Sequence, residues 1–113
     1  MERGELRWFE PSPIEGSEQS GRRPAVVLSR DAINRTSPVV IVLPLTTYRG
    51  QRIYPSDVLV RAPEGGLRVN SVVLGLQLRA IDRRRLGERL GRLGAPTLAR
   101  IEDAVLAVLD IER

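Results

Sequence analysis

The chain has 113 residues and a formal net charge of +4, and its eighteen basic residues are all arginine. We expect residues 1–113 to form a single domain, because this length suits one hydrophobic core. Cysteine, histidine and lysine are absent, which excludes disulfides, thiolate metal sites, a Cys nucleophile, a His general base and a Lys Schiff base. Any catalysis must therefore use Arg, Asp or Glu, Ser or Thr, Tyr, or the substrate itself.

The arginines are concentrated in the middle of the chain. Residues 22–92 carry fourteen Arg against five Asp or Glu, a net charge of +9, whereas both flanking segments are acidic. This distribution favours a polyanionic ligand, although a coding bias that replaces lysine by arginine explains the composition equally well. No segment has the length or the apolar character of a signal peptide or a membrane span, so we expect a cytoplasmic protein.

The first half of the chain predicts strands around one long loop. Residues 4–10 alternate as a half-buried strand does, and residues 11–24 are too rich in Pro, Gly and Ser for regular structure. Residues 24–30 and 37–47 are β-branched runs of strand length. Between them we expect a short helical turn capped by Asp31.

The second half predicts more strands and one helix. Residues 56–62 alternate again before a turn, and residues 70–81 form one further β-rich run. Residues 82–94 fit either a frayed basic helix or a turn followed by a short strand, and their three glycines favour the second. The last segment predicts an amphipathic helix that begins at Pro96, and its apolar face would hold Leu98, Ile101, Val105, Val108 and Leu109.

These elements predict a mainly β fold. Six or seven short strands and one C-terminal helix, at this length, suggest a small barrel or curled sheet with the helix packed against it. A candidate site lies in the predicted long loop, just before a strand that we expect to be buried. Its polar residues are Ser17, Glu18, Gln19, Arg22 and Arg23. Taken alone, this pattern fits a solvated turn better than an active site.

Several motifs in a fixed order change that interpretation. Residues 3–47 contain the motifs RGE, GSEQ and RP, followed in order by NR, SP and a Thr. Residues 71–86 read SVVLGLQLRAIDRRRL. Together they resemble the MazF/PemK family of type II toxin–antitoxin endoribonucleases over nearly the whole chain. The resemblance implies a small SH3-like barrel of the MazF/PemK and CcdB-like type with a C-terminal α-helix. It also implies a homodimer that binds single-stranded RNA in a groove between its subunits, and an acidic MazE-like antitoxin.

The implied reaction needs no cofactor and no metal. Attack by the RNA 2′-hydroxyl would give a 2′,3′-cyclic phosphate and a 5′-hydroxyl, so the protein would have to supply only positioning and charge stabilisation. The family's catalytic arginine falls on Arg23, whose forked donors suit two phosphate oxygens. The catalytic threonine falls on Thr46, with Thr47 as the alternative if the strand end is shifted. Glu18 is a candidate general base or orienting group, and it fits equally well as a carboxylate that braces the loop.

The resemblance also indicates which residues contact RNA or the antitoxin. The expected RNA-binding residues are Ser17, Gln19, Arg22, Thr47, Gln77 and Arg79. Leu76 and Ala80 depart from the family pattern, which places the base preference in doubt but not the reaction. Trp8, Phe9 and Tyr54 are candidates for base stacking, although Trp8 and Phe9 point to opposite faces of a strand and at least one should be core. Three consecutive arginines, residues 83–85, could hold an acidic antitoxin tail.

Two non-catalytic functions compete with the nuclease. One is a CcdB-like interaction module that inhibits gyrase, or a degenerate relative that binds RNA without cutting it. The other is a basic RNA-binding barrel in which Arg23 is one phosphate contact among many. The pairing of Arg23 with Thr46 favours cleavage, because a protein-binding module does not need that pair.

Overall fold

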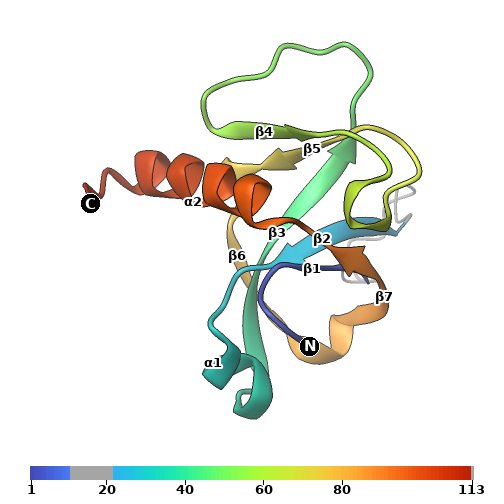
Figure 1. Cartoon of the computed structure of the whole chain (residues 1–113). Helices are drawn as coiled ribbons and strands as arrows, with labels where there is room; N and C mark the ends of the chain where they lie inside the picture. Colours follow the sequence, from blue (N-terminus) through green and yellow to red (C-terminus); the bar gives the residue numbers. More distant parts are fainter. Residues whose placement is uncertain (11–21, 113) are drawn as a thin grey trace, which may run out of the picture.

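The computed structural model describes residues 1–10 and 22–112, which form a strongly twisted antiparallel sheet with one long helix across it (Figure 1). The seven strands are β1 (Glu5–Phe9), β2 (Arg23–Val27), β3 (Val39–Thr47), β4 (Asp57–Val60), β5 (Ser71–Leu74), β6 (Arg79–Asp82) and β7 (Leu86–Arg92). The helices are α1 (Asp31–Thr36) and α2 (Ala95–Leu109), with 3₁₀ turns η2 (Glu64–Gly66), η3 (Gly75–Gln77) and η4 (Arg83–Arg85). The mainly β fold with a C-terminal helix is confirmed.

The nine-residue strand β3 organises the sheet. The strand order is β4-β5-β3-β2-β1-β7, and β6 pairs with β3 as well. β2 runs antiparallel along the middle of β3, from Ala25↔Pro44 to Val27↔Val42. β6 pairs with the first part of β3 and β5 with its last three residues. β3 is therefore shared by a five-stranded sheet and a three-stranded sheet.

The five-stranded sheet β7-β1-β2-β3-β6 curls because its outer strands are joined by η4 alone. The backbone N–H of Arg83 donates to the Pro38 carbonyl at 2.9 Å, and that of Glu10 donates to the Arg85 carbonyl at 3.2 Å. These bonds tie η4 to the ends of β3 and β1. In the part of the chain that the structure describes, β6 and β7 do not pair with each other, so the sheet is curled and not hydrogen-bonded into a closed barrel.

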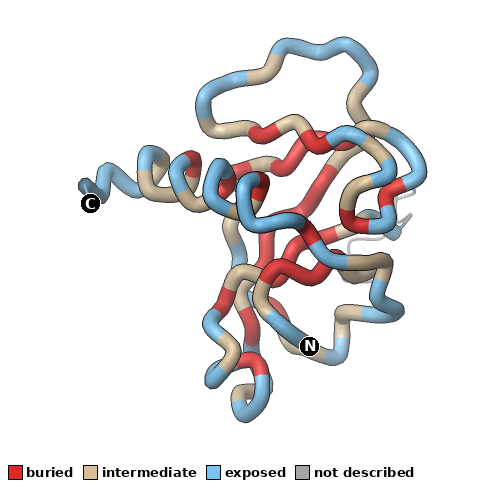
Figure 2. Tube along the Cα trace, in the orientation of Figure 1, coloured by how far each residue is buried: buried red, intermediate tan, exposed pale blue. Residues whose placement is uncertain are grey.

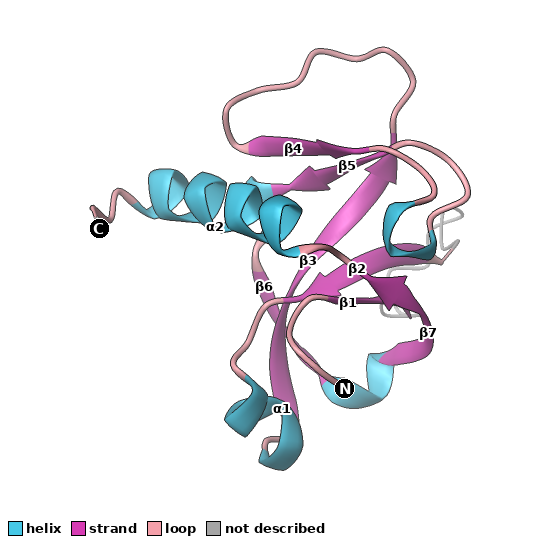
Figure 3. Ribbon diagram, viewed as in Figure 1, coloured by secondary structure: helices cyan, strands magenta, loops and turns pink. Residues whose placement is uncertain are grey.

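The predicted continuous run over residues 70–81 is wrong, because η3 divides it into β5 and β6. The division occurs at Gly75, whose N–H donates to the Ser56 carbonyl at 2.9 Å. A Cβ at this position would collide with the same carbonyl oxygen. At this close approach to the Ser56 backbone the chain turns. It leaves β5, which pairs with the last residues of β3, and enters β6, which pairs with the first residues of β3. For residues 82–94 the turn-and-strand alternative is confirmed by η4 and β7 (Figure 3).

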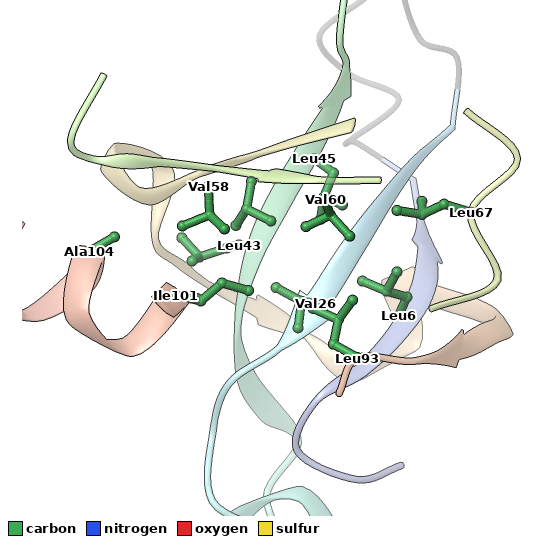
Figure 4. Close-up of a cluster of buried hydrophobic side chains, with 11 residues drawn as sticks. Leu6, Val26, Leu43, Leu45, Val58, Val60, Leu67, Leu93, Ile101 and Ala104 are labelled. Atoms are coloured by element: carbon green, nitrogen blue, oxygen red, sulfur yellow. The ribbon is translucent and has the colours of Figure 1, made fainter. Parts of the chain in front are cut away.

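Two clusters of buried side chains lie on opposite faces of the five-stranded sheet. The larger cluster is enclosed by β4, β5, the sheet and α2, and its side chains converge in Figure 4. It contains Leu6, Val26, Leu43, Leu45, Val58, Val60, Leu67, Val73, Leu93, Ile101 and Ala104. The smaller cluster lines the concave side of the curl and contains Phe9, Ala25, Val27, Val40, Val42 and Ile81. Alternation along β2 supplies both clusters, because successive side chains of a strand point to opposite faces.

Helix α2 covers the larger cluster, and its inner side is buried (Figure 2). Pro96 lies in its first turn, as predicted. The buried residues are Thr97, Ile101 and Ala104, so the buried face is rotated from the predicted one. Leu109 is 50% exposed and was wrongly assigned to that face. Of the described helices, none is both long and apolar enough to cross a membrane.

The short helix α1 forms as expected, but Asp31 is not its N-cap. Arg30 occupies the cap position, and Asp31 is the first helical residue. Its carboxylate accepts hydrogen bonds from the Arg3 backbone N–H at 2.7 Å and from Asn34 Nδ2 at 3.3 Å. The bond from Arg3 ties α1 to the segment before β1. Neither donor is a backbone amide of the first helical turn, which is the group that an N-cap side chain binds.

Candidate active site

A cavity opens where β2 begins and β3 ends. Its volume is about 710 Å³. Strands β1 and β7 and the segment that joins η2 to β5 form its other walls. The lining residues are Trp8, Arg22, Arg23, Pro24, Leu45, Thr46, Thr47, Arg49, Gly66, Leu67, Arg68, Val69, Ser71, Arg89 and Leu90. Four residues predicted for the site, Arg22, Arg23, Thr46 and Thr47, are thus brought together.

Strand register explains why Arg23 and Thr46 share this cavity. Ala25 pairs with Pro44 in the antiparallel β2–β3 ladder. Arg23 and Thr46 each lie two residues beyond that pair, at the same end of the ladder, and so fall on the same faces of their strands as Ala25 and Pro44. Opposed residues of an antiparallel pair project to the same face of the sheet. A guanidinium and a hydroxyl from two different strands can therefore address one ligand group.

Five arginines line the cavity: Arg22, Arg23, Arg49, Arg68 and Arg89. None of the lining residues is Asp or Glu, so the described wall is cationic. Arginine forks bind phosphate oxygens with two parallel hydrogen bonds, and a desolvated cleft of one charge strengthens attraction for a polyanion. The cavity therefore suits a phosphodiester backbone better than an apolar or cationic ligand.

Arg49, Arg68 and Arg89 were not predicted as site residues. Their membership depends on where the loop after β3, the loop before β5 and strand β7 lie in space. The net charge of the central segment was the only sequence signal for them. Assigning these three arginines to the cavity requires knowledge of which strands pair.

Arg89 is held by a buried carboxylate behind the cavity wall. Glu5 on β1 is 4% exposed, and its Oε1 accepts a hydrogen bond from Arg7 Nε at 2.9 Å. Its Oε2 lies 3.8 Å from Arg89 Nε. Burial opposes ionisation, but the Arg7 hydrogen bond and charge and the Glu2 backbone hydrogen bond together lower the pKa of Glu5 below its ordinary value. Glu5 is thus an ionised anchor for Arg7 and lies near Arg89, and of these two arginines Arg89 lines the cavity.

Trp8 contributes an aromatic surface to the cavity. The guanidinium carbon of Arg22 lies 4.6 Å from the centre of the Trp8 ring, which is a cation–π stack. Phe9, the neighbour of Trp8, is 2% exposed and belongs to the smaller cluster. The prediction that at least one of these two aromatics is core is confirmed.

Of the other predicted residues, Gln77 and Arg79 do not line this cavity. Ser17, Glu18 and Gln19 lie outside the described residues. Gln77 is in η3, and Arg79 begins β6 with its guanidinium 5.1 Å from the Phe9 ring.

Of the three consecutive arginines in η4, two are engaged within the chain. Arg84 binds Asp82 through Nε at 3.0 Å and Nη2 at 2.8 Å, and the hydrogen bonds from Arg84 lower the pKa of Asp82 to about 2. Arg83 donates to the Ser37 carbonyl at 3.2 Å. Contacts of this kind compete with a partner for the same guanidinium groups.

In residues 1–10 and 22–112, no group of three or more Asp or Glu side chains is placed to hold a metal ion. The described lining of the cavity offers guanidinium groups, hydroxyls and one aromatic stack.

Comparison with known proteins gives one family and several relatives of similar length. Residues 2–109 match the family described as PemK-like, MazF-like toxin of type II toxin–antitoxin system. The chain is 36% identical to endoribonuclease MazF9 of Mycobacterium tuberculosis, with 98% of each chain covered. It is 34% identical to endoribonuclease EndoA of Bacillus subtilis, with 97% of each covered. A crystal structure of MazE–MazF from Deinococcus radiodurans matches with a TM-score of 0.80 and 31% identity, over 99% of this chain and 98% of that chain.

Proposed function

Because the chain belongs to the PemK-like, MazF-like toxin family of type II toxin–antitoxin systems, we propose that it cuts single-stranded RNA as a sequence-specific endoribonuclease. The proposal covers residues 1–113 as one domain that acts in the cytoplasm. The observation that carries it is the convergence of Arg23 and Thr46 on one cationic cavity. Relatives of more than 30% identity over nearly full length are named endoribonucleases, which supports the same reaction.

The proposed reaction is transesterification within the RNA. The 2′-oxygen forms a bond to the neighbouring phosphorus, and the bond from phosphorus to the 5′-oxygen breaks. The 2′-hydroxyl loses its proton, the departing 5′-oxygen gains one, and the products are a 2′,3′-cyclic phosphate and a 5′-hydroxyl. Because the substrate supplies its own nucleophile, the protein needs neither a metal nor a covalent intermediate.

Arg23 and Thr46 have complementary roles in this step. The Arg23 guanidinium donates to the non-bridging oxygens, where negative charge builds in the pentavalent transition state. The Thr46 hydroxyl donates to the same phosphate and fixes its orientation. Guanidinium groups remain protonated in proteins, so Arg23 is a charge stabiliser and not a base. We propose Glu18, which lies outside the described residues, as the acceptor of the 2′-hydroxyl proton.

The proposed RNA path extends beyond the reacting phosphate. Arg22 and Thr47 line the cavity beside the catalytic pair and would hold adjacent nucleotides. Ser17 and Gln19 precede them on the loop. Gln77 and Arg79 lie outside the cavity of one chain, and we propose that they contact RNA in the groove of a homodimer.

Regulation follows from the cationic character of the same cavity. A MazE-like antitoxin with an acidic segment would compete with RNA for these arginines. The MazE–MazF structure from Deinococcus radiodurans supports a partner of this kind.

The test is cleavage of a long single-stranded RNA by the purified chain in the presence of a chelator, followed by mapping of both new ends. We expect discrete cuts with 2′,3′-cyclic phosphate and 5′-hydroxyl ends. Arg23→Ala should reduce the single-turnover rate by about 100-fold or more, the usual effect of losing one transition-state donor. Arg35→Ala is the matched control, because Arg35 is an exposed arginine of α1 outside the cavity.

Binding without cleavage would refute the nuclease and favour a non-catalytic RNA-binding or CcdB-like module. Cleavage that requires a divalent metal would refute the mechanism. Equal loss of activity in Arg23→Ala and Arg35→Ala would refute the assignment of Arg23.

A further inference from the structure

The pair formed by Trp8 and Arg22 is the only aromatic–arginine stack at the described cavity. Both residues line it, and the Arg22 guanidinium lies 4.6 Å from the Trp8 ring centre. Trp8 is half-buried on β1, whereas Arg22 is exposed just before β2. The indole therefore supports the guanidinium group of an exposed arginine.

This stack and the proposed catalytic arginine line the same cavity. Trp8 pairs with Pro24, and Phe9 pairs with Arg23. Trp8 and Arg23 thus project to opposite faces of the β1–β2 pair, and Arg22 and Arg23 are consecutive in the chain. Because both arginines line the cavity, a strand whose phosphate is bound by Arg23 has a neighbouring nucleotide within the same cavity as Arg22.

The chemistry of the stack differs from that of the other cavity arginines. A planar guanidinium binds a nucleic acid base by stacking on its π face, and proteins that bind single-stranded RNA use aromatic and arginine planes for this purpose. A guanidinium that already rests on an indole is held in one orientation, which lowers the entropy lost when a base binds. Arg49, Arg68 and Arg89 have no aromatic partner among the cation–π contacts of the described residues.

We propose that Trp8 and Arg22 form a base-stacking platform for a nucleotide next to the scissile phosphate. Its ligand is an unpaired RNA base that stacks on the guanidinium face opposite the indole. This inference rests on the proposed RNA cleavage and adds a specificity-determining contact to it. Trp8 is a positioning residue that acts through Arg22.

The alternative is that Arg22 contacts only phosphate and that the stack merely braces the start of β2. The two possibilities differ in what they require of the base. A phosphate contact is insensitive to removal of the base, so the effect of Arg22→Lys would be the same with and without the base. A stacking contact needs both the base and the guanidinium plane.

The experiment uses an oligonucleotide that spans a mapped cut and carries 2′-deoxyribose at the attacking position, so that it binds without being cut. The base is removed in turn from the nucleotide on each side of the scissile phosphate. Dissociation constants are measured for wild type, Arg22→Lys and Trp8→Leu. Arg52→Lys is the matched control, because Arg52 stacks on Tyr54 at 4.9 Å outside the cavity.

We expect one abasic position to weaken wild-type binding about tenfold, the usual scale for one stacked base. Arg22→Lys should weaken binding of the intact oligonucleotide by a similar factor and leave the abasic one nearly unchanged. Trp8→Leu should likewise weaken binding of the intact oligonucleotide but not of the abasic one, whereas Arg52→Lys should not show this difference. Circular dichroism and thermal unfolding will establish that each variant is folded, and Arg22→Lys serves as the mild change if Trp8→Leu is not.

If base removal and Arg22→Lys change the dissociation constant independently of each other, the platform is overturned, even if cleavage and binding are intact. Insensitivity of wild type to both abasic positions would overturn it as well. If the wild-type chain neither cuts nor binds RNA, the proposed function fails together with the platform. The two failures are therefore distinguishable.

Discussion

Replacement of Glu5 by Gln should destabilise the chain by removing one negative charge from behind the cavity wall. Gln has nearly the same shape as Glu, so packing of the side chain, which is 6% exposed, is preserved. Gln keeps one oxygen that can accept from Arg7 Nε, which lies 2.9 Å from the Glu5 carboxylate in wild type, but this acceptor is neutral. Arg7 and Arg89 would then lack their counter-charge.

The magnitude follows from exposure. The Arg7 side chain is 23% exposed, so its charged hydrogen bond to Glu5 is only partly screened and contributes about 1.5–3 kcal/mol. The Arg89 side chain is 51% exposed and its Nε is 3.8 Å away, so that ion pair adds little. We expect the free energy of unfolding to fall by about 2 kcal/mol near neutral pH, which for a domain of this size lowers Tm by about 8 °C.

The assay is urea denaturation of wild type and Glu5→Gln at several pH values. The folded-state pKa of Glu5 is lowered, so its stabilisation is fully present above the ordinary Glu pKa of about 4.3 and is lost as pH falls through the folded-state pKa. The difference between the two proteins should therefore be largest near neutral pH and should narrow in acid. Glu2→Gln is the control, because the Glu2–Arg92 ion pair is about half exposed on both sides and contributes little.

A difference that stays constant from neutral to acid pH would refute the reasoning, since protonated Glu and Gln are both neutral. Equal losses in Glu5→Gln and Glu2→Gln would show that burial does not strengthen the Glu5 contacts.

Three further predictions concern other parts of the fold. Asn34→Asp should cost about 2–3 kcal/mol in urea denaturation, because the fully buried amide donates at 2.7 Å to a backbone carbonyl that a carboxylate would repel. Arg84→Ala should raise the pKa of Asp82 from about 2 toward its ordinary range in an NMR titration, and in wild type the stabilisation by this pair should be lost only as pH falls toward about 2. Ile101→Ala should cost about 3 kcal/mol, whereas Leu109→Ala should stay within about 0.5 kcal/mol, because Ile101 is fully buried and Leu109 is half exposed.

Each of these has an outcome that would contradict it. Asn34→Asp with wild-type stability would mean that the buried amide is not bound as described. An unchanged pKa of Asp82 in Arg84→Ala would exclude Arg84 as its cause. Equal losses in Ile101→Ala and Leu109→Ala would contradict the burial of one α2 face.

Sequence patterns predicted most of the strands because burial and alternation are local properties. Residues 37–47 form a β-branched run whichever strands pair with it, and β3 occupies residues 39–47. The break at Gly75 depends on the approach of the Ser56 backbone, which is nineteen positions away in the sequence. The rotated face of α2 depends on the shape of the cluster that it covers, so helical periodicity alone placed Leu109 wrongly.

The candidate site was predictable where it rested on motifs. Arg23 and Thr46 were assigned from family motifs, and the register of β2 and β3 now accounts for their shared cavity. Arg68 and Arg89 come from segments that carry no motif of their own. Only the pairing of β7 with β1 and the path of the chain before β5 bring them to this wall.

The pairing of β7 with β1 has a consequence for synthesis of the toxin. β1 lies near the start of the chain, and its outer neighbour is supplied by residues 86–92. Until those residues have been made, a growing chain lacks both this edge of the sheet and the cavity arginine at position 89. Non-local strand pairing is slow and completes late in folding. The proposed site is therefore completed only after residues 86–92 have been synthesised, and a chain that stops before them lacks one wall of the cavity.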